Sequence, residues 1–156
     1  MITLALVRHA KSDWGDPGLD DHDRPLNDRG RRDAPVLAAR LAQTGFRPRA
    51  LLTSTALRAR TTAGYFADAL GVHAEERAEL YGAPARTLLS AAAASGAPQV
   101  MVVAHDPGMS VLADALSKGE IGAMPTCAVA VFTWDADDWD VATSVDPTSW
   151  TFDSPR

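Results

Sequence analysis

The chain alternates between short apolar runs rich in strand-forming residues and longer segments in which apolar residues recur at helical spacing. Residues 4–7 and 99–104 have the continuous apolar character of strands that are buried on both faces, and residues 50–53 form a shorter run of the same kind. Buried strands that alternate with helices are typical of a parallel sheet covered on both sides. The pattern predicts an α/β fold, a three-layer α/β/α sandwich around a mostly parallel sheet.

The first helix is predicted after a long polar loop that spans residues 11–28. Leu37 and Leu41 recur at helical spacing and precede a glycine stop at residue 45. Two starts fit the sequence. Asn27 caps a long helix that is kinked at Pro35, or Asp33 caps a shorter helix that takes Pro35 in its first turn.

Three further helices are predicted from their start signals. Ser54 or Thr55 caps a helix that runs to about residue 70, and a short strand is expected at residues 72–74. Pro84 opens an alanine-rich helix that ends near residue 96. Asp106 as N-cap and Pro107 as first helical residue begin a helix that ends near residue 117.

The C-terminal part of the chain is predicted to form the antiparallel edge of the sheet. Residues 127–134 and 139–145 have the composition of strands, and the acidic segment 135–138 between them is typical of a turn. Cys127 is expected to fill core space in the first of these strands.

Length and composition indicate one globular domain, residues 1–156, with 46% hydrophobic and 22% charged residues. The sequence has no apolar run of the roughly 20 residues that a membrane span needs and no basic segment typical of a secretory signal, so we expect a cytoplasmic protein without a membrane partner. The single cysteine cannot form an intramolecular disulfide or a thiolate metal site. A net charge of -5 disfavours a nucleic-acid partner. The sequence does not predict an oligomeric state.

Candidate chemistry lies where two buried strands end, because each delivers a histidine at the point of chain reversal. His9 follows Arg8, and His105 follows the strand at residues 99–104. Parallel strands end at one rim, so the two imidazoles are expected to meet there. Arg58, in the helix after residues 50–53, adds a guanidinium group, whereas Arg60 points to solvent. Such a rim suits a phosphoryl group, which arginine binds with two donors.

Three sequence blocks resemble the histidine phosphatase superfamily, which is also called phosphoglycerate mutase-like. They are Arg8-His9-Ala10; the block of Ser54, Leu57, Arg58, Ala59, Thr62 and Ala63; and His105-Asp106. The short chain, the Arg-His-Ala-Lys-Ser opening and Asp23-Arg24-Pro25-Leu26 with Gly30 are most similar to the SixA branch of phosphohistidine phosphatases. Ala10 and Ala104 replace glycines that are usual in the family, and their effect on the approach to phosphate stays open.

The resemblance implies roles for individual residues. His9 is the expected nucleophile that becomes phosphorylated, and His105 is the second histidine of the pocket. Arg8 and Arg58 are expected to bind phosphate, and Ser12 to bind substrate. The proton donor has three candidates: Glu79, at the place where related branches carry a catalytic glutamate, and, with weaker support, Asp13 and Asp21. No cofactor and no metal is expected.

The preferred function is a phosphatase that acts on a phosphorylated protein carrying phosphohistidine. Two alternatives remain at this point. The first is a phosphatase of small phosphoesters that uses Glu79 as acid, and the second is a phosphate-binding module without catalysis. His22 and His73 lack a comparable context and are predicted surface residues.

Overall fold

A twisted six-stranded sheet forms the centre of the computed structural model, which describes residues 1–155. The strand order is β3-β2-β4-β1-β5-β6. The first four strands are mutually parallel, and β5 pairs antiparallel with β1 and with β6. The strands are β1 (Ile2–Arg8), β2 (Ala50–Thr53), β3 (Ala74–Glu76), β4 (Gln99–Ala104), β5 (Val129–Trp134) and β6 (Ser149–Asp153).

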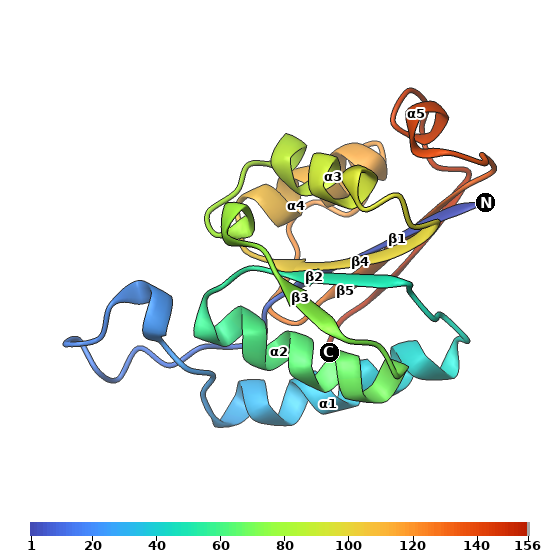
Figure 1. Ribbon diagram of the computed structural model, residues 1–156. Helices are drawn as coiled ribbons and strands as arrows, with labels where there is room; N and C mark the ends of the chain where they lie inside the picture. Colours follow the sequence, from blue (N-terminus) through green and yellow to red (C-terminus); the bar gives the residue numbers. More distant parts are fainter. Residues whose placement is uncertain (156) are drawn as a thin grey trace.

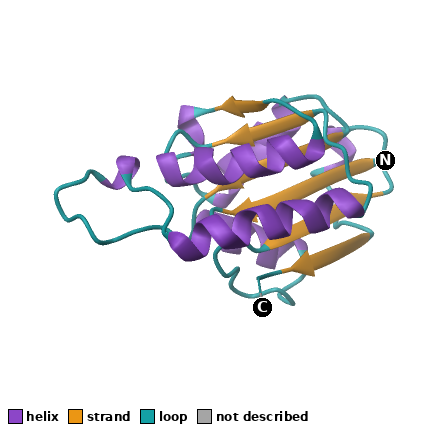
Figure 2. Cartoon of the chain, turned by 90° about the horizontal axis from the view of Figure 1, so that it is seen from below, coloured by secondary structure: helices purple, strands orange, loops and turns teal. Residues whose placement is uncertain are grey.

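Helices cover both faces of this sheet, which confirms the predicted three-layer sandwich (Figure 1). One face packs against α1 (Asp28–Gln43) and α2 (Leu57–Leu70), which lie side by side over the sheet, roughly along the strands, in Figure 2. The other face packs against α3 (Ala85–Ala94) and α4 (Gly108–Leu116). Two short 3-10 helices, η1 (Asp21–Asp23) and η2 (Ala78–Leu80), and the small helix α5 (Trp139–Ala142) complete the secondary structure.

The buried strands β1 and β4 form the middle of the molecule, since their side chains contribute to the core on both faces. Leu4 and Leu6 face the α3–α4 layer, while Ala5 and Val7 face the α1–α2 layer, and all four are fully buried. Successive strand residues point to opposite faces, so a run of apolar residues is required wherever both faces are covered. This arrangement fixes the position of the residues that follow β1 and β4. None of the helices within residues 1–155 combines the length and the apolar character needed to cross a membrane.

Helix α1 follows the longer of the two predicted alternatives. Asn27 is the N-cap, and its side chain accepts a hydrogen bond of 2.9 Å from the backbone N–H of Gly30. Pro35 lies inside the helix, as its eighth residue, where it removes one backbone donor without ending the helix.

The predicted starts of α2 and α4 are wrong by one or two residues, for related reasons. The N-cap of α2 is Ala56, because the hydroxyl groups of Ser54 and Thr55 instead contact histidine side chains. The N-cap of α4 is Pro107, while the Asp106 carboxylate accepts from Ser110 N at 2.9 Å. Ser54 and Thr55 therefore make tertiary contacts, and Asp106 lies one residue before the N-cap.

The C-terminal prediction is wrong in part. Residues 139–145 do not form a strand, because the Asp138 side chain accepts a hydrogen bond from Val141 N at 2.9 Å and so caps α5. The sixth strand is β6, further along the chain. Cys127 is buried as predicted, but it precedes β5 and has a positive φ of 64°. The third strand is β3, two residues later than predicted, because Val72 N still bonds to the end of α2.

Candidate active site

The two strand-end histidines lie side by side at one rim of the sheet, as the sequence predicts. β1 and β4 are adjacent and parallel, with Arg8 in register with Ala104. His9 N donates a hydrogen bond of 3.1 Å to Ala104 O, and the ring centroids of His9 and His105 are 5.1 Å apart. The sheet register therefore brings two residues 96 positions apart in the sequence into ring contact; His9, His105 and the side chains around them are called the pocket below.

His9 is held in the tautomer that a nucleophile requires. Its side chain is almost fully buried, and Nδ1 donates a hydrogen bond of 2.8 Å to Ala10 O, which leaves the lone pair on Nε2. Burial lowers the pKa of His9 to about 4, against the opposing effect of the hydrogen bond to Ala10. Three guanidinium groups lower this pKa further, those of Arg58, Arg8 and Arg24. The imidazole is therefore neutral at pH 7.

His105 is oriented by a hydroxyl group at the end of β2. Its Nε2 lies 2.6 Å from Ser54 Oγ, and Ser54 Oγ accepts a hydrogen bond from Ala56 N at 3.2 Å. Within residues 1–155, Nε2 is the only acceptor bonded to this hydroxyl, so we assign the hydroxyl hydrogen to that bond and the proton of neutral His105 to Nδ1. Burial lowers the pKa of His105 to about 3, and the neighbouring charges of His9 and Arg58 lower it further.

Two arginines line the same pocket and retain free donors. Arg8 donates through NH1 to Met124 O at 2.8 Å, and Arg58 donates through NH1 and NH2 to Asp21. The Nε atoms of Arg8 and Arg58, like Nδ1 of His105, are buried without a hydrogen-bond partner within residues 1–155. Buried donors left unpaired carry a free-energy cost that a bound anion removes. Three such donors from three chain segments indicate an anion site.

Residues 12–26 form an arm that projects from the body of the molecule beside this pocket (Figure 1). The arm is closed at its base by the bridge between Ser12 and Leu26 and by a hydrogen bond of 2.8 Å from Asp13 N to Pro25 O. Gly30 packs against this base, since a Cβ there would lie 2.2 Å from Lys11 O. A fixed base positions the arm relative to the pocket.

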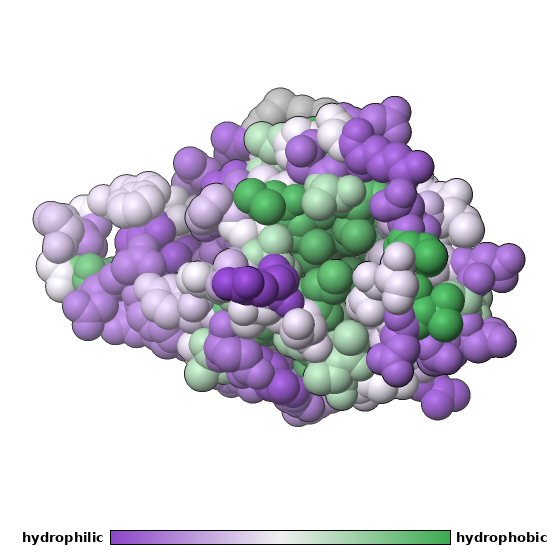
Figure 3. Space-filling model, turned by 90° about the horizontal axis from the view of Figure 1, so that it is seen from above, coloured by the Kyte–Doolittle hydropathy of each residue, from purple (hydrophilic) through white to green (hydrophobic). Residues whose placement is uncertain are grey.

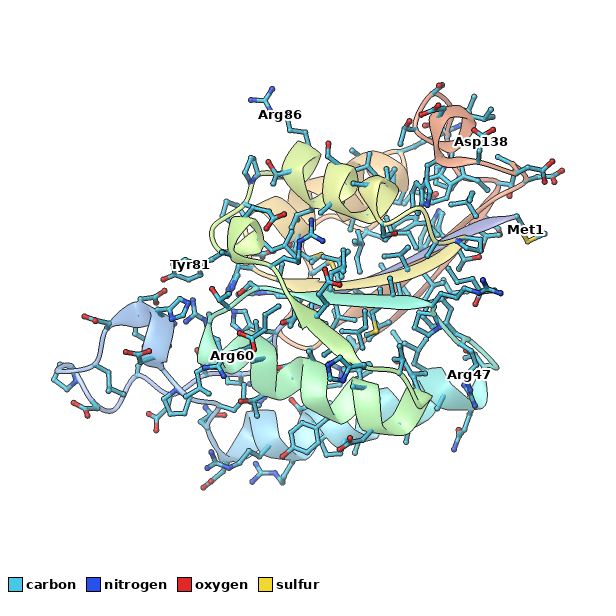
Figure 4. All side chains as sticks on the ribbon, viewed as in Figure 1. Met1, Arg47, Arg60, Tyr81, Arg86 and Asp138 are labelled. Atoms are coloured by element: carbon cyan, nitrogen blue, oxygen red, sulfur yellow. The ribbon has the colours of Figure 1, made fainter. Side chains whose placement is uncertain are left out.

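Asp21, in η1 of the arm, connects the arm to the pocket. Its carboxylate accepts hydrogen bonds from Tyr81 Oη at 2.6 Å, from Arg58 at 2.9 Å and from Arg24 at 3.1 Å. These bonds, that of Tyr81 foremost, hold the pKa of Asp21 well below its usual range. Tyr81 extends toward the arm in Figure 4, and its ring meets His105 edge-on at 5.4 Å between centroids. The sequence offered Asp21 only as a candidate acid and Tyr81 not at all.

Other arm residues support this arrangement. Arg24 is buried, donates to Ser12 Oγ at 2.7 Å and lies 3.4 Å above the ring of Trp14. The hydroxyl of Ser12, at the base of the arm, is therefore bonded to Arg24 within the arm. His22 lies 2.8 Å from Thr55 Oγ1 and is only partly exposed, so the prediction of a plain surface residue is wrong for it.

The structure does not bring Glu79 into contact with either imidazole. Its carboxylate is exposed and bonded to Arg77 at 3.0 Å, and this contact lowers the pKa of Glu79. Asp13 is also exposed, and its carboxylate accepts from Gly15 N at 2.6 Å. Arg60 binds Thr55 O and lies 3.8 Å from Glu76, away from the histidines as predicted.

Comparison with known proteins decides the family. The family model of the histidine phosphatase superfamily (branch 1) matches residues 4–82. The chain belongs to the histidine phosphatase superfamily. Protein Rv1276c of Mycobacterium tuberculosis is 40% identical over 115 residues, which cover 72% of this chain and 70% of that protein. A chloroplastic protein of Arabidopsis thaliana, At3g52155, is 48% identical over 59 residues, which span only 27% of its length.

Solved structures place this family member near SixA proteins. A structure assigned as phosphohistidine phosphatase SixA from Agrobacterium tumefaciens has a TM-score of 0.78 and 34% identity, over 85% of this chain and 92% of that chain. The protein histidine phosphatase SixA in complex with tungstate has a TM-score of 0.77 and 25% identity, over 99% and 97% of the two chains. The chain is a phosphatase with the phosphoglycerate mutase-like fold.

Proposed function

We propose that the chain hydrolyses phosphohistidine on proteins through a phosphorylated His9. The observation that carries this proposal is that neutral His9 lies beside His105, with ring centroids 5.1 Å apart, and near the charges of Arg58 and Arg8. Within residues 1–155, Arg8 Nε, Arg58 Nε and His105 Nδ1 are buried without a hydrogen-bond partner. A nucleophile beside preorganised donors is the arrangement that phosphoryl transfer requires.

In the first step, Nε2 of His9 attacks phosphorus, and the bond between phosphorus and the substrate imidazole breaks. The substrate imidazole, protonated at its other ring nitrogen, departs as a neutral group. Arg8, Arg58 and His105 donate to the phosphoryl oxygens, whose charge they stabilise in the transition state. The hydrogen bond from His9 Nδ1 to Ala10 O keeps that proton on His9 while Nε2 is phosphorylated.

In the second step, water attacks phosphorus, and the bond from phosphorus to His9 Nε2 breaks. Because Nδ1 has kept its proton, His9 departs as a neutral imidazole, by the same chemistry as the substrate in the first step. The proton of the attacking water passes to the phosphate that leaves.

Phosphohistidine fits the site better than a phosphoester, because two of the three candidate proton donors, Asp21 and Glu79, are held in their ionised form. Asp21 is bonded to Tyr81 and Arg58, Glu79 is bonded to Arg77, and both have a lowered pKa. An alkoxide leaving group needs an acid that still carries its proton, whereas a protonated phosphoimidazole needs none. The similarity to SixA structures supports the same substrate class.

The test is to mix the protein with phosphoramidate or a phosphohistidine protein and to quench within one turnover. We expect acid-labile, base-stable phosphate on a peptide that contains His9, and release of inorganic phosphate at longer times. His9→Ala is expected to lose turnover by more than about 1,000-fold. Unchanged turnover in His9→Ala would refute the mechanism.

A matched control is His73→Ala, since His73 is exposed and lies far from the pocket in sequence and fold. We expect wild-type turnover for it. Turnover of a phosphoserine peptide at the rate of the phosphohistidine substrate would contradict the substrate assignment and leave the phosphoenzyme step intact.

A further inference from the structure

A groove on the arm lies outside the pocket that holds the histidines. Its volume is about 330 Å³, and it opens on the arm between the base and η1. Its lining combines apolar and charged side chains, namely Trp14, Asp16, Pro17, Leu19, Asp21 and Arg24. Trp14 is 70% exposed and Leu19 is 39% exposed, although both are large hydrophobic residues. Exposed apolar side chains grouped around a groove are typical of a binding surface.

The groove shares one residue, Asp21, with the contacts of the active site. Asp21 lines the groove and also bonds to Arg58 and Tyr81 of the pocket. A substrate whose phosphoryl group is bound by Arg58 therefore brings the residues next to it over the arm.

The charge of the arm indicates which side chains the substrate carries next to its phosphohistidine. Five aspartates of the arm are exposed, namely Asp13, Asp16, Asp20, Asp21 and Asp23. Of these, Asp21 is paired with Arg58 and with the buried Arg24. In Figure 3 the arm is coloured mainly purple to white with a small green area, in contrast to the larger hydrophobic area on the α3–α4 side of the body. An apolar groove with an acidic rim complements a segment that carries an apolar side chain together with Lys or Arg.

We propose that the arm groove docks the protein segment that flanks the phosphohistidine, and that this segment carries an apolar residue and basic residues. This inference rests on the proposed phosphohistidine phosphatase activity. The outer part of the arm, with Asp16, Leu19 and Asp20, acts as a specificity element: it discriminates among phosphoproteins by what surrounds the phosphohistidine and leaves the phosphoryl transfer itself unchanged.

The experiment uses three substrates: phosphoramidate and two phosphohistidine peptides that differ only in carrying two Lys or two Glu beside the phosphohistidine. We expect wild-type protein to hydrolyse the Lys peptide with a kcat/KM about tenfold above that of the Glu peptide, mainly through KM. The preference should shrink as the salt concentration rises from 20 to 300 mM, because exposed charges are screened.

Asp16→Asn/Asp20→Asn tests the charge. Asn at position 16 retains the oxygen that accepts from Gly18 N, so the loop geometry is preserved. We expect this double variant to lose most of the preference for the Lys peptide and to hydrolyse phosphoramidate at the wild-type rate. Leu19→Ser tests the apolar part, and we expect it to raise KM about fivefold for both peptides without affecting phosphoramidate.

Asp135→Asn/Asp137→Asn is the matched control, because these exposed carboxylates lie near α5, at the far end of the molecule from the arm (Figure 4, where Asp138 is labelled). We expect it to keep the wild-type preference.

Each failure has a distinct meaning. Hydrolysis of all three substrates with no preference between the peptides, and no effect of the arm variants, would overturn the docking proposal alone. Failure to hydrolyse any of the three would overturn the proposed function as well. A dimer in sedimentation that Leu19→Ser dissociates would assign the groove to a second copy of the chain and overturn the proposal too.

Discussion

At the scale of single residues, the pocket depends on imidazoles that stay neutral among several positive charges. His9 and His105 both have a lowered pKa, and burial is the largest cause in each case. Neutral His9 retains the lone pair that attacks phosphorus, and neutral His105 retains its Nδ1 proton while Nε2 accepts from Ser54. The same burial that prepares the nucleophile makes the folded state sensitive to acid.

The first prediction concerns that sensitivity. The pKa of His9 is about 4 in the folded state, below the value of about 6.5 in the unfolded state, so the unfolded chain binds more protons between these values. Stability is therefore fully present above pH 6.5 and is lost as the pH falls toward 4. Between pH 7 and pH 5, His9 should lower the free energy of unfolding by about 2 kcal/mol. Urea unfolding at both pH values measures this.

His9→Gln should remove this contribution, so its free energy of unfolding should fall less than that of wild type over the same pH interval. His73→Gln, which changes an exposed histidine, should behave as wild type. Equal losses in wild type and His9→Gln would show that His9 is protonated in the folded state.

The second prediction concerns Asp21, whose carboxylate bonds to the NH2 group of Arg58. A bound phosphate dianion shares this guanidinium group and is repelled by the carboxylate. Asp21→Asn removes the negative charge and keeps an oxygen that accepts hydrogen bonds, so we expect the dissociation constant of inorganic phosphate to fall about fivefold. Calorimetric titration with phosphate tests this. Weaker binding would mean that Asp21 mainly holds Arg58 in position.

At the scale of elements, two helices depend on glycines at close backbone approaches. A Cβ on Gly30 of α1 would lie 2.2 Å from Lys11 O, and a Cβ on Gly108 of α4 would lie 2.1 Å from Ala83 O. Both contacts are to backbone atoms, which cannot move without shifting the arm base or the segment before α3. These glycines therefore determine where the functional segments lie.

The third prediction is that Gly30→Ala lowers the free energy of unfolding by about 2–3 kcal/mol, because the added methyl group displaces the Lys11 backbone. Gly64→Ala is the matched control. Gly64 lies inside α2 with no atom within 4 Å of an added Cβ, so alanine there should stabilise the protein by about 0.5–1 kcal/mol. Urea unfolding compares the two. A neutral Gly30→Ala would mean that the arm base yields to the methyl group.

The local sequence pattern predicted most helices and strands correctly. It misplaced a helix start where a polar side chain bonds to a residue far away in the sequence. β1, β2 and β4 follow from their apolar runs, and α3 follows from Pro84 and its alanines. The helix start after Ser54 was misplaced because its hydroxyl binds His105, 51 residues away. α5 was taken for a strand, although the cap at Asp138 is a local signal that identifies a helix.

The same distinction explains which site residues the sequence revealed. His9 and His105 stand at the ends of recognisable strands, so their meeting follows from the parallel sheet. Asp21 and Tyr81 meet over a separation of 60 residues, and both lie in segments without periodicity. The sequence around such a loop residue contains no pattern that identifies its distant partner. The contact is seen only in the folded structure.

At the scale of the whole molecule, the anion site exists only when the chain is folded. Arg8, Arg58 and His105 come from three segments separated by about fifty residues each, and the sheet order brings them to one rim. An anion that binds this site binds the folded state and has no equivalent site on the unfolded chain. Binding must therefore stabilise the whole fold by mass action.

The last prediction follows from this linkage. Inorganic phosphate at ten times its dissociation constant should stabilise the protein by about 1.4 kcal/mol, which corresponds to a rise of roughly 3–6 °C in Tm for a chain of this size. Arg8→Gln removes a buried donor whose Nε has no partner within residues 1–155, so the rise at the same phosphate concentration should largely disappear. Chloride at matched ionic strength controls for salt effects. An equal rise in wild type and Arg8→Gln would place the bound anion elsewhere, since a site formed by the three segments cannot lose Arg8 without losing affinity.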